Sequence, residues 1–196
     1  GDDTRKFAPP YMKDSDGKDT NQSAYFSGTN RNKRSLTLDL SSKDGQAIAK
    51  ELIAKSDILV ENFKVGTLKK YNLDYESLKD QFPNLIYCSI TGFGQTGPYA
   101  SRPAYDALVQ AMGGVMSLTG EPDGEPMKVG VSIADLMAGM YATVSILAAL
   151  RHRDKTNEGQ HIDISMLDAH VAWLANQGMN YLSLIHISEP TRLSGI

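Results

Sequence analysis

The chain has 196 residues, of which 41% are hydrophobic and 22% are charged, so its length and composition suit a globular protein with one substantial core. Lysine and arginine total 20 and aspartate and glutamate total 23, which gives a net charge of -3. This balance excludes a general electrostatic attraction to nucleic acid or to an anionic membrane, and we predict neither partner.

The cysteine content, the length of the apolar stretches and the spacing of possible metal ligands indicate which further features to expect. Cys88 is the only cysteine, which excludes an internal disulfide, and its apolar setting predicts a small buried side chain rather than a reactive thiol. No apolar stretch is expected to approach the roughly 20 residues that cross a bilayer. No spacing of histidine, cysteine and carboxylate residues suggests a metal site, so we predict none.

The chain begins with a polar, charged stretch over residues 1–21 that shows no hydrophobic periodicity, and we interpret it as a surface arm or loop. Within residues 35–40, Leu36, Leu38 and Leu40 alternate with polar residues, as expected for a strand with one apolar face. The sequence therefore predicts a first strand at 35–40.

Helices and strands alternate in the next part of the chain. Ser42 is a suitable N-cap for a helix over residues 42–55, whose apolar residues fall on one face. A short buried strand is predicted directly after it, at 57–60. Further along come helical segments at 65–71 and 74–81 and a strand at 85–90.

This alternation predicts an α/β fold, a Rossmann-like parallel sheet with flanking helices. Ligands of such sheets bind at the carboxyl ends of the strands, which here lead into the loops 61–63 and 91–98. The remaining predicted elements are helices at 104–116 and 133–151, a strand at 161–165 and a helix at 167–181.

A single carboxylate, Asp135, lies at the predicted start of the helix 133–151. With Ser132 as the N-cap, Asp135 is the third helical residue, where free N–H groups and the helix dipole favour its ionised form. Gly139, one turn further on, leaves room for a bulky ligand. However, Ser132-x-x-Asp135 also fits a capping box, in which the acid only supports its own helix, and the pattern alone favours that interpretation.

Several motifs favour a chemical role for Asp135 over a capping role, because they occur together and in order. The motifs are VENF at 60–63, TGFGQTGP at 91–98, RPAYD at 102–106 and GQHIDISMLDA at 159–169. With Asp135-x-x-x-Gly139, they make the sequence similar to the class III coenzyme A transferase family, over nearly all of residues 1–182. That family includes formyl-CoA, carnitine and glutarate CoA-transferases and the related 2-methylacyl-CoA racemases.

The resemblance implies a reaction and a nucleophile. Asp135 would transfer coenzyme A (CoA) between an acyl-CoA thioester and a free carboxylic acid, through aspartyl anhydride and aspartyl-CoA thioester intermediates. The acyl-CoA is a substrate, and no tightly bound cofactor or metal is implied. The backbone N–H groups of the loop 91–98 could stabilise an oxyanion or could only form turns, and both interpretations remain open.

Two alternatives accompany the transferase hypothesis. The racemases carry a histidine where this chain has Tyr105, and tyrosine, with an ordinary pKa of about 10, is poorly suited to proton transfer at neutral pH. The transferase is therefore preferred over a racemase or epimerase. The second alternative is an inactive fragment that only binds CoA or dimerises.

The resemblance also implies which residues contact the coenzyme. Lys70 falls where several members carry a phosphate-pairing arginine, and lysine keeps the charge without the bidentate geometry. The expected coenzyme contacts are Leu38, Leu40, Asn62, Phe63, Lys70, Arg102 and Tyr105.

For domain organisation, residues 1–182 are expected to be part of the family's large domain. We expect the family's first strand and helix to precede residue 1 and its small domain to follow residue 182. Residues 183–196 are interpreted as a foreign tail resembling adapter or vector sequence. The implied partners are an acyl-CoA, a carboxylic acid acceptor and a second copy in a homodimer, in the cytoplasm or the mitochondrial matrix.

Overall fold

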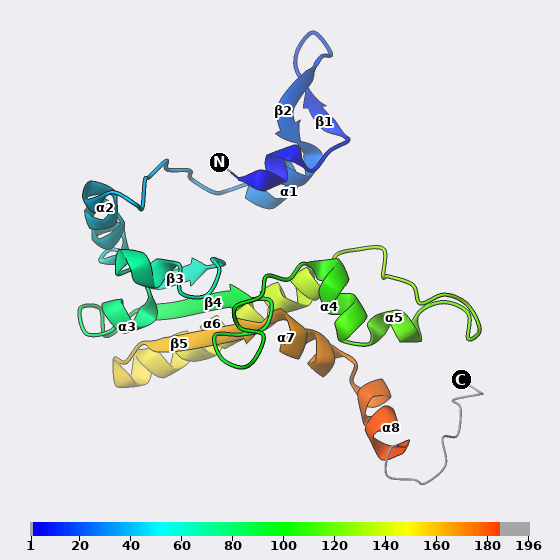
Figure 1. The fold of residues 1–196 in the computed structure, drawn as a ribbon. Helices are drawn as coiled ribbons and strands as arrows, with labels where there is room; N and C mark the ends of the chain where they lie inside the picture. Colours follow the sequence, from blue (N-terminus) through cyan, green and yellow to red (C-terminus); the bar gives the residue numbers. More distant parts are fainter. Residues whose placement is uncertain (1, 185–196) are drawn as a thin grey trace. The chain divides into compact units, whose positions relative to one another are not determined.

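The computed structural model describes residues 2–184 and forms two compact units, residues 1–40 and 41–196 (Figure 1). The first unit contains a short 3-10 helix η1 (Asp3–Lys6), the strands β1 (Tyr11–Lys13) and β2 (Asp19–Ser23), and the helix α1 (Ala24–Asn30).

The first unit corrects the prediction of a structureless arm. The strands β1 and β2 pair antiparallel, and the Asp14 carboxylate accepts hydrogen bonds from the N–H groups of Asp16 and Lys18 in the turn between them. Ser23, which is fully buried, caps α1 by accepting from the Phe26 N–H at 2.9 Å. Short polar strands held by turn chemistry lack the apolar alternation that a sequence pattern detects.

The predicted strand at 35–40 is wrong. No helix or strand is assigned between α1 and the helix α2 (Lys43–Ile53), and Leu36 is 64% exposed. Alternation supplies an apolar face, but a strand also needs a neighbour that pairs with its backbone. Neither sheet formed by the described residues includes this segment.

The second unit confirms the parallel sheet. Its strands β3 (Ile58–Glu61), β4 (Ile86–Thr91) and β5 (Gln160–Ser165) lie in the order β3-β4-β5 and all run parallel. The register aligns Val60, Cys88 and Ile162 across the sheet. Val60 is 52% exposed, so β3 is less buried than predicted.

One face of the sheet carries short helices. Ser42 caps α2 through the Gly45 N–H, as predicted. The segments predicted as helices at 65–71 and 74–81 form only single turns, η2 (Leu68–Tyr71) and α3 (Tyr75–Leu78). Tyr75 stacks on His161 of β5 with ring centroids 4.7 Å apart, so α3 packs on the sheet.

The other helices are α4 (Asp106–Met112), α5 (Val115–Leu118), α6 (Ile133–Thr156), α7 (Met166–Trp173) and α8 (Asn176–Leu184). The continuous helices predicted at 104–116 and 167–181 are each divided in two. Gly114 adopts φ 92° between α4 and α5, and Ala175 adopts φ 49° between α7 and α8. A residue in this left-handed region cannot continue a right-handed helix.

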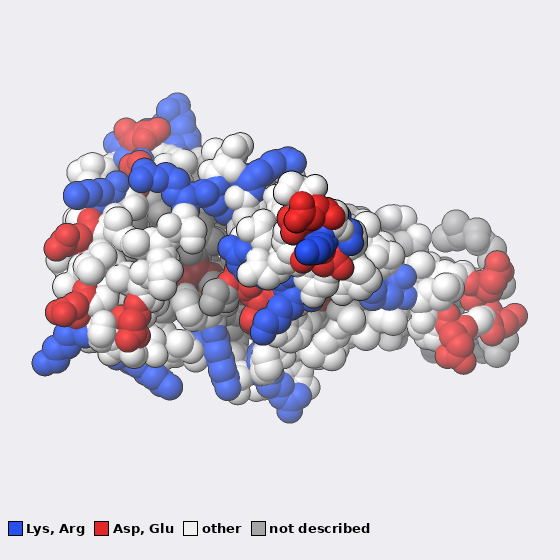
Figure 2. Space-filling model, turned by 90° about the horizontal axis from the view of Figure 1, so that it is seen from above, with Lys and Arg blue, Asp and Glu red and all other residues white. Residues whose placement is uncertain are grey.

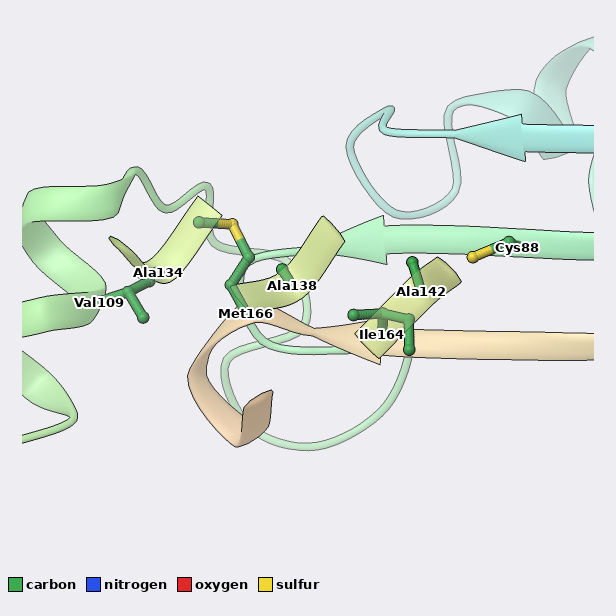
Figure 3. Close-up of a cluster of buried hydrophobic side chains, with 7 residues drawn as sticks. All are labelled: Cys88, Val109, Ala134, Ala138, Ala142, Ile164 and Met166. Atoms are coloured by element: carbon green, nitrogen blue, oxygen red, sulfur yellow. The ribbon is translucent and has the colours of Figure 1, made fainter. Parts of the chain in front are cut away.

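The core lies between α6 and the strands β4 and β5. Ala134, Ala138 and Ala142 form one face of α6 and belong to one buried cluster with Cys88 of β4 and Ile164 of β5. In Figure 3, Ala142 lies beside Ile164, and Ala134 lies beside Val109 of α4. The small alanine side chains let the helix approach the sheet closely. Cys88 is fully buried, which confirms the prediction of a buried side chain. This burial raises the pKa of its thiol to about 11, which keeps the reactive thiolate scarce at neutral pH.

Helix α6 also corrects the expectation that no apolar stretch approaches membrane-spanning length. It has 24 residues, and its most apolar window has a mean hydropathy of 1.7, with 22% of the window buried. By length and composition alone it could cross a bilayer, but its alanine face belongs to the core. In the view of Figure 2, basic (blue) and acidic (red) side chains are interspersed over the visible surface.

Gly159, between α6 and β5, offers a test of this packing. A Cβ atom there would lie 2.7 Å from the Asn84 carbonyl carbon and closer still to the Leu85 oxygen. Because backbone atoms cannot move aside cheaply, we expect Gly159→Ala to lower the free energy of unfolding by about 1–3 kcal/mol.

Chemical denaturation monitored by circular dichroism measures this loss. Gly130→Ala is the matched control, because a Cβ atom at Gly130 would meet nothing within 4 Å. The control should stay within about 1 kcal/mol of the parent. Equal stability of the two variants would contradict the close approach of the backbone at Gly159.

Candidate functional site

Asp135 lies in the first turn of α6, as predicted, and its side chain is exposed. No hydrogen bond within the described residues holds its carboxylate. Gly139 is one turn further on, and a Cβ atom there would meet nothing within 4 Å. Open space therefore lies on the same face of α6, one turn beyond Asp135.

The structure confirms Ser132 at the N-cap position of α6, but the predicted capping hydrogen bond is wrong. The Ser132 side chain makes no such bond. The Asp106 carboxylate, on α4, accepts the Ala134 N–H instead, at 2.9 Å. A free N–H group of the first turn is thus satisfied from a neighbouring helix, and the serine half of the predicted capping box does not form.

Asp106 holds this position through further hydrogen bonds. It is only 7% exposed, and its second carboxylate oxygen accepts from the Gln110 side chain at 2.8 Å and lies 3.5 Å from the Lys128 ammonium. The Gln110 side-chain oxygen in turn accepts the Val129 N–H at 2.8 Å. This cluster, Asp106, Gln110 and Lys128, fixes the segment that leads into α6.

The same surroundings set the charge state of Asp135. Loss of hydration against the neighbouring protein atoms raises the pKa of its carboxyl above the ordinary value, and the negative charge of Asp106 raises that pKa further. Lys128 opposes both effects by lowering it. The net direction is the reverse of what a helix N-terminus alone would produce.

A pocket of about 160 Å³ lies where β3 and β4 end. Its lining includes four of the predicted coenzyme contacts, Asn62, Phe63, Arg102 and Tyr105. The structure therefore brings together side chains from loops that are far apart in sequence. Aromatic surface beside a cation is a combination that suits a ligand with a ring and phosphate groups.

Lys64 is a lining residue that the sequence pattern did not single out. It contributes to this pocket and also to a neighbouring one of about 330 Å³, next to Ser89 and His161. Its position directly after the Glu-Asn-Phe motif was the available signal. Sequence reasoning placed the phosphate-binding charge at Lys70 instead.

Three predicted contacts are not among the residues that line this pocket. Lys70 is exposed at the end of η2, and its role stays a prediction. Leu38 and Leu40 belong to the first unit, and their role stays a prediction. Asp135 does not line the pocket either. It lies in the first turn of α6, which packs beside α4. The first residue of α4, Asp106, directly follows the pocket residue Tyr105.

Hydrogen bonds tie the loops that follow β3 and β4 to the neighbouring strands of the sheet. The Asn62 side chain donates to the Ile90 carbonyl at 2.5 Å. In the glycine-rich loop, the Gly94 N–H donates to the Thr91 hydroxyl at 3.0 Å and the Gln95 N–H donates to the Asp163 carboxylate at 2.8 Å. These two N–H groups hold the loop's shape, which favours the turn interpretation for them over oxyanion binding.

Within residues 2–184, the histidine, cysteine, aspartate and glutamate side chains form no group of three or more that could hold a metal ion. His161 is within 3.0 Å of the Ser89 hydroxyl, and His170 is buried on α7. Both lie where the sequence predicted, on a strand and on a helix.

Several known proteins are similar in sequence to this chain. The chain is 54% identical over 182 residues to the succinate–glutarate CoA-transferase of Agrobacterium fabrum, covering 93% of the chain and 45% of that protein. It is 42% identical to the succinyl-CoA:glutarate CoA-transferase of Mus musculus, covering 93% of the chain and 40% of that protein. It is 46% identical to the acetyl-CoA:oxalate CoA-transferase of Acetobacter aceti, covering 89% of the chain and 43% of that protein. The chain thus spans less than half the length of these relatives.

Known structures share the fold. A CaiB/BaiF family protein from Brucella suis matches with a TM-score of 0.87 and 52% identity, over 93% of this chain and 48% of that one. A solved structure from Mycobacterium tuberculosis matches with a TM-score of 0.73 and 32% identity, over 79% of this chain and 43% of that one. The model of CoA-transferase family III matches residues 1–195. The chain therefore belongs to CoA-transferase family III.

Proposed function

We propose that the protein containing this chain transfers CoA from an acyl-CoA to a free carboxylic acid, with Asp135 as the nucleophile. The observation that carries the proposal is the exposed carboxylate in the first turn of α6, which no hydrogen bond within the described residues holds and which has open space one turn beyond it at Gly139. A carboxylate that served only as a cap would be bonded to its own helix.

The reaction proceeds through covalent intermediates on Asp135. A carboxylate oxygen attacks the thioester carbonyl, the C–S bond breaks, and CoA leaves as a thiolate from a mixed anhydride. The thiolate attacks the aspartyl carbonyl, which releases the donor acid and forms an aspartyl-CoA thioester. The acceptor carboxylate displaces CoA to form a second anhydride, and the thiolate then attacks the acceptor carbonyl. Asp135 is regenerated without any net transfer of protons.

The site favours these steps mainly by position. A carboxylate is a weak nucleophile in water, and fixing it beside the thioester carbonyl can supply up to about 7–11 kcal/mol of the barrier. The cluster Asp106, Gln110 and Lys128 supplies that rigidity by holding the start of α6. Loss of hydration around Asp135, which raises the pKa of its carboxyl, also makes the ionised form more reactive.

The coenzyme is proposed to occupy the pocket at the ends of β3 and β4. Phe63 and Tyr105 are 45% and 80% exposed, so aromatic surface is available to a ligand. Arg102 and Lys64 add positive charge to the same lining. These features match a molecule that carries an adenine ring and phosphate groups.

The acids exchanged are proposed to be short dicarboxylic acids. The names of the similar enzymes from Agrobacterium fabrum, Mus musculus and Acetobacter aceti contain succinate, succinyl-CoA, glutarate and oxalate. Succinyl-CoA as donor and a glutarate-like acceptor are therefore our first choice. A homodimer, and a cytoplasmic or mitochondrial location, remain predictions.

Replacing the nucleophile tests the mechanism. In the protein that contains this chain, Asp135→Asn should reduce CoA transfer by at least about 1,000-fold, because the amide cannot form the anhydride. CoA affinity should change little, since the pocket residues are intact. Mass spectrometry of the parent protein with succinyl-CoA should find an adduct on Asp135. Undiminished transfer by the variant would remove Asp135 from the mechanism.

Gly139→Ala tests whether the thioester approaches along α6. A Cβ atom at Gly139 meets nothing in the fold, and alanine stabilises a helix by about 0.5–1 kcal/mol relative to glycine. Stability should therefore be kept or raised while the rate of transfer falls. Gly28→Ala, in α1, also meets nothing within 4 Å and is the control. Full transfer by Gly139→Ala would place the substrate elsewhere.

A pair of lysine variants tests the coenzyme pocket. Lys64→Gln should weaken CoA binding by about 5- to 10-fold, as expected for losing one contact between a cation and a phosphate. Lys70→Gln is the matched control, because Lys70 is not part of the pocket lining, and its affinity should be unchanged. Isothermal titration calorimetry with CoA measures both. A loss confined to Lys70→Gln would restore the prediction made from the sequence.

A further inference from the structure

Asp106 is a buried acid whose charge is not required for the capping bond it makes. An asparagine oxygen could accept the Ala134 N–H equally well, yet the chain places a carboxylate there at 7% exposure. Burying an ionised group is costly unless partners compensate it. The partial compensation here comes from Gln110 at 2.8 Å and from Lys128 at 3.5 Å.

The position of this acid relative to the nucleophile is fixed by the backbone. Its Oδ1 atom is 2.9 Å from the N–H of Ala134, the residue immediately before Asp135. The carboxylate that orients the first turn of α6 is therefore a close electrostatic neighbour of the carboxylate that the turn presents. Lys128, in the segment before α6, places a positive charge 3.5 Å from the Asp106 carboxylate.

We propose that Asp106 is a positioning residue for the transfer reaction: its hydrogen bond to the Ala134 N–H fixes how the first turn of α6 presents Asp135, and its charge, together with that of Lys128, acts on the Asp135 carboxylate. The inference rests on the proposed function, because it assigns Asp106 a role in serving the nucleophile. Asp106 itself is not proposed to touch the substrate.

The charged groups around Asp135 act in opposite directions. Loss of hydration raises the pKa of the Asp135 carboxyl most, Asp106 on α4 raises that pKa further, and Lys128 lowers it. His170 on α7 is also close enough to respond to Asp106, but its own burial lowers the pKa of its imidazole, which favours the neutral ring. Asp106 and Lys128 are therefore the groups whose charge the experiment must change.

The expected signs follow from which charge is removed. In Asp106→Asn a negative neighbour is lost, so the pKa of Asp135 should fall. In Lys128→Gln a positive neighbour is lost, so the pKa of Asp135 should rise. The nucleophile is the ionised form, so the low-pH limb of the transfer rate should move to lower pH in the first variant and to higher pH in the second.

Two measurements test the proposal. Carbon-13 NMR of the side-chain carboxylates gives the pKa of Asp135 in this chain directly, without any need for turnover. The pH profile of transfer in the protein that contains the chain gives the low-pH limb. Asp154→Asn, near the other end of α6, is the control and should move neither value.

Opposite shifts in the two variants, seen both by NMR and in the pH profile, would support the proposal. A purely structural cap predicts instead that Asp106→Asn leaves the pKa of Asp135 unchanged, and that result would overturn it. Shifts of the same sign in both variants would also overturn it. If Asp106→Asn does not fold, Lys128→Gln alone decides the matter, because Lys128 is partly exposed and should tolerate replacement.

The outcome is separable from that of the proposed function. NMR shifts of the expected signs without matching changes in the pH profile would overturn the positioning role, even if Asp135→Asn is inactive. Full activity of Asp135→Asn would instead remove the nucleophile assignment, whatever the NMR titration shows.

Discussion

The hydrogen bond from the Ala134 N–H to the Asp106 carboxylate is the contact on which the site depends. It joins α4 to the first turn of α6 and decides where that helix begins. Because the bond is buried, its loss would leave polar groups without partners in the interior. The exposed Asp135 carboxylate is thus supported from inside the protein, and one acid is available for chemistry because another holds the helix.

The sheet gives this arrangement its foundation. The strands β4 and β5 carry the core residues on which the alanine face of α6 rests, so the helix cannot turn without disturbing Cys88 and Ile164. At the carboxyl ends of the strands, the bond from Asn62 to the Ile90 carbonyl ties the loop after β3 to β4. Rigid elements on one side and loops tied to the sheet on the other are what a preformed ligand site requires.

Local patterns in the sequence predicted those features that local interactions determine. The apolar runs placed β3, β4 and β5 to within about one residue, and the periodicity of 133–151 found α6 and put Asp135 in its first turn. The capping role of Asp106 could not be predicted, because it joins residues 28 positions apart. Alternation at 35–40 misled because pairing depends on a neighbouring strand. The break at Gly114 had a signal in its glycine pair, whereas Ala175 gave none.

Cys88 gives the molecule a built-in probe of its own motions. The thiol is fully buried against the alanine face of α6, so an alkylating reagent can reach it only when the helix separates from the sheet. Since Cys88 is the single cysteine of the chain, the rate of its labelling under native conditions reports the free energy of that local opening. The same opening displaces the helix that carries Asp135, so slow labelling and a firmly held Asp135 share one physical origin.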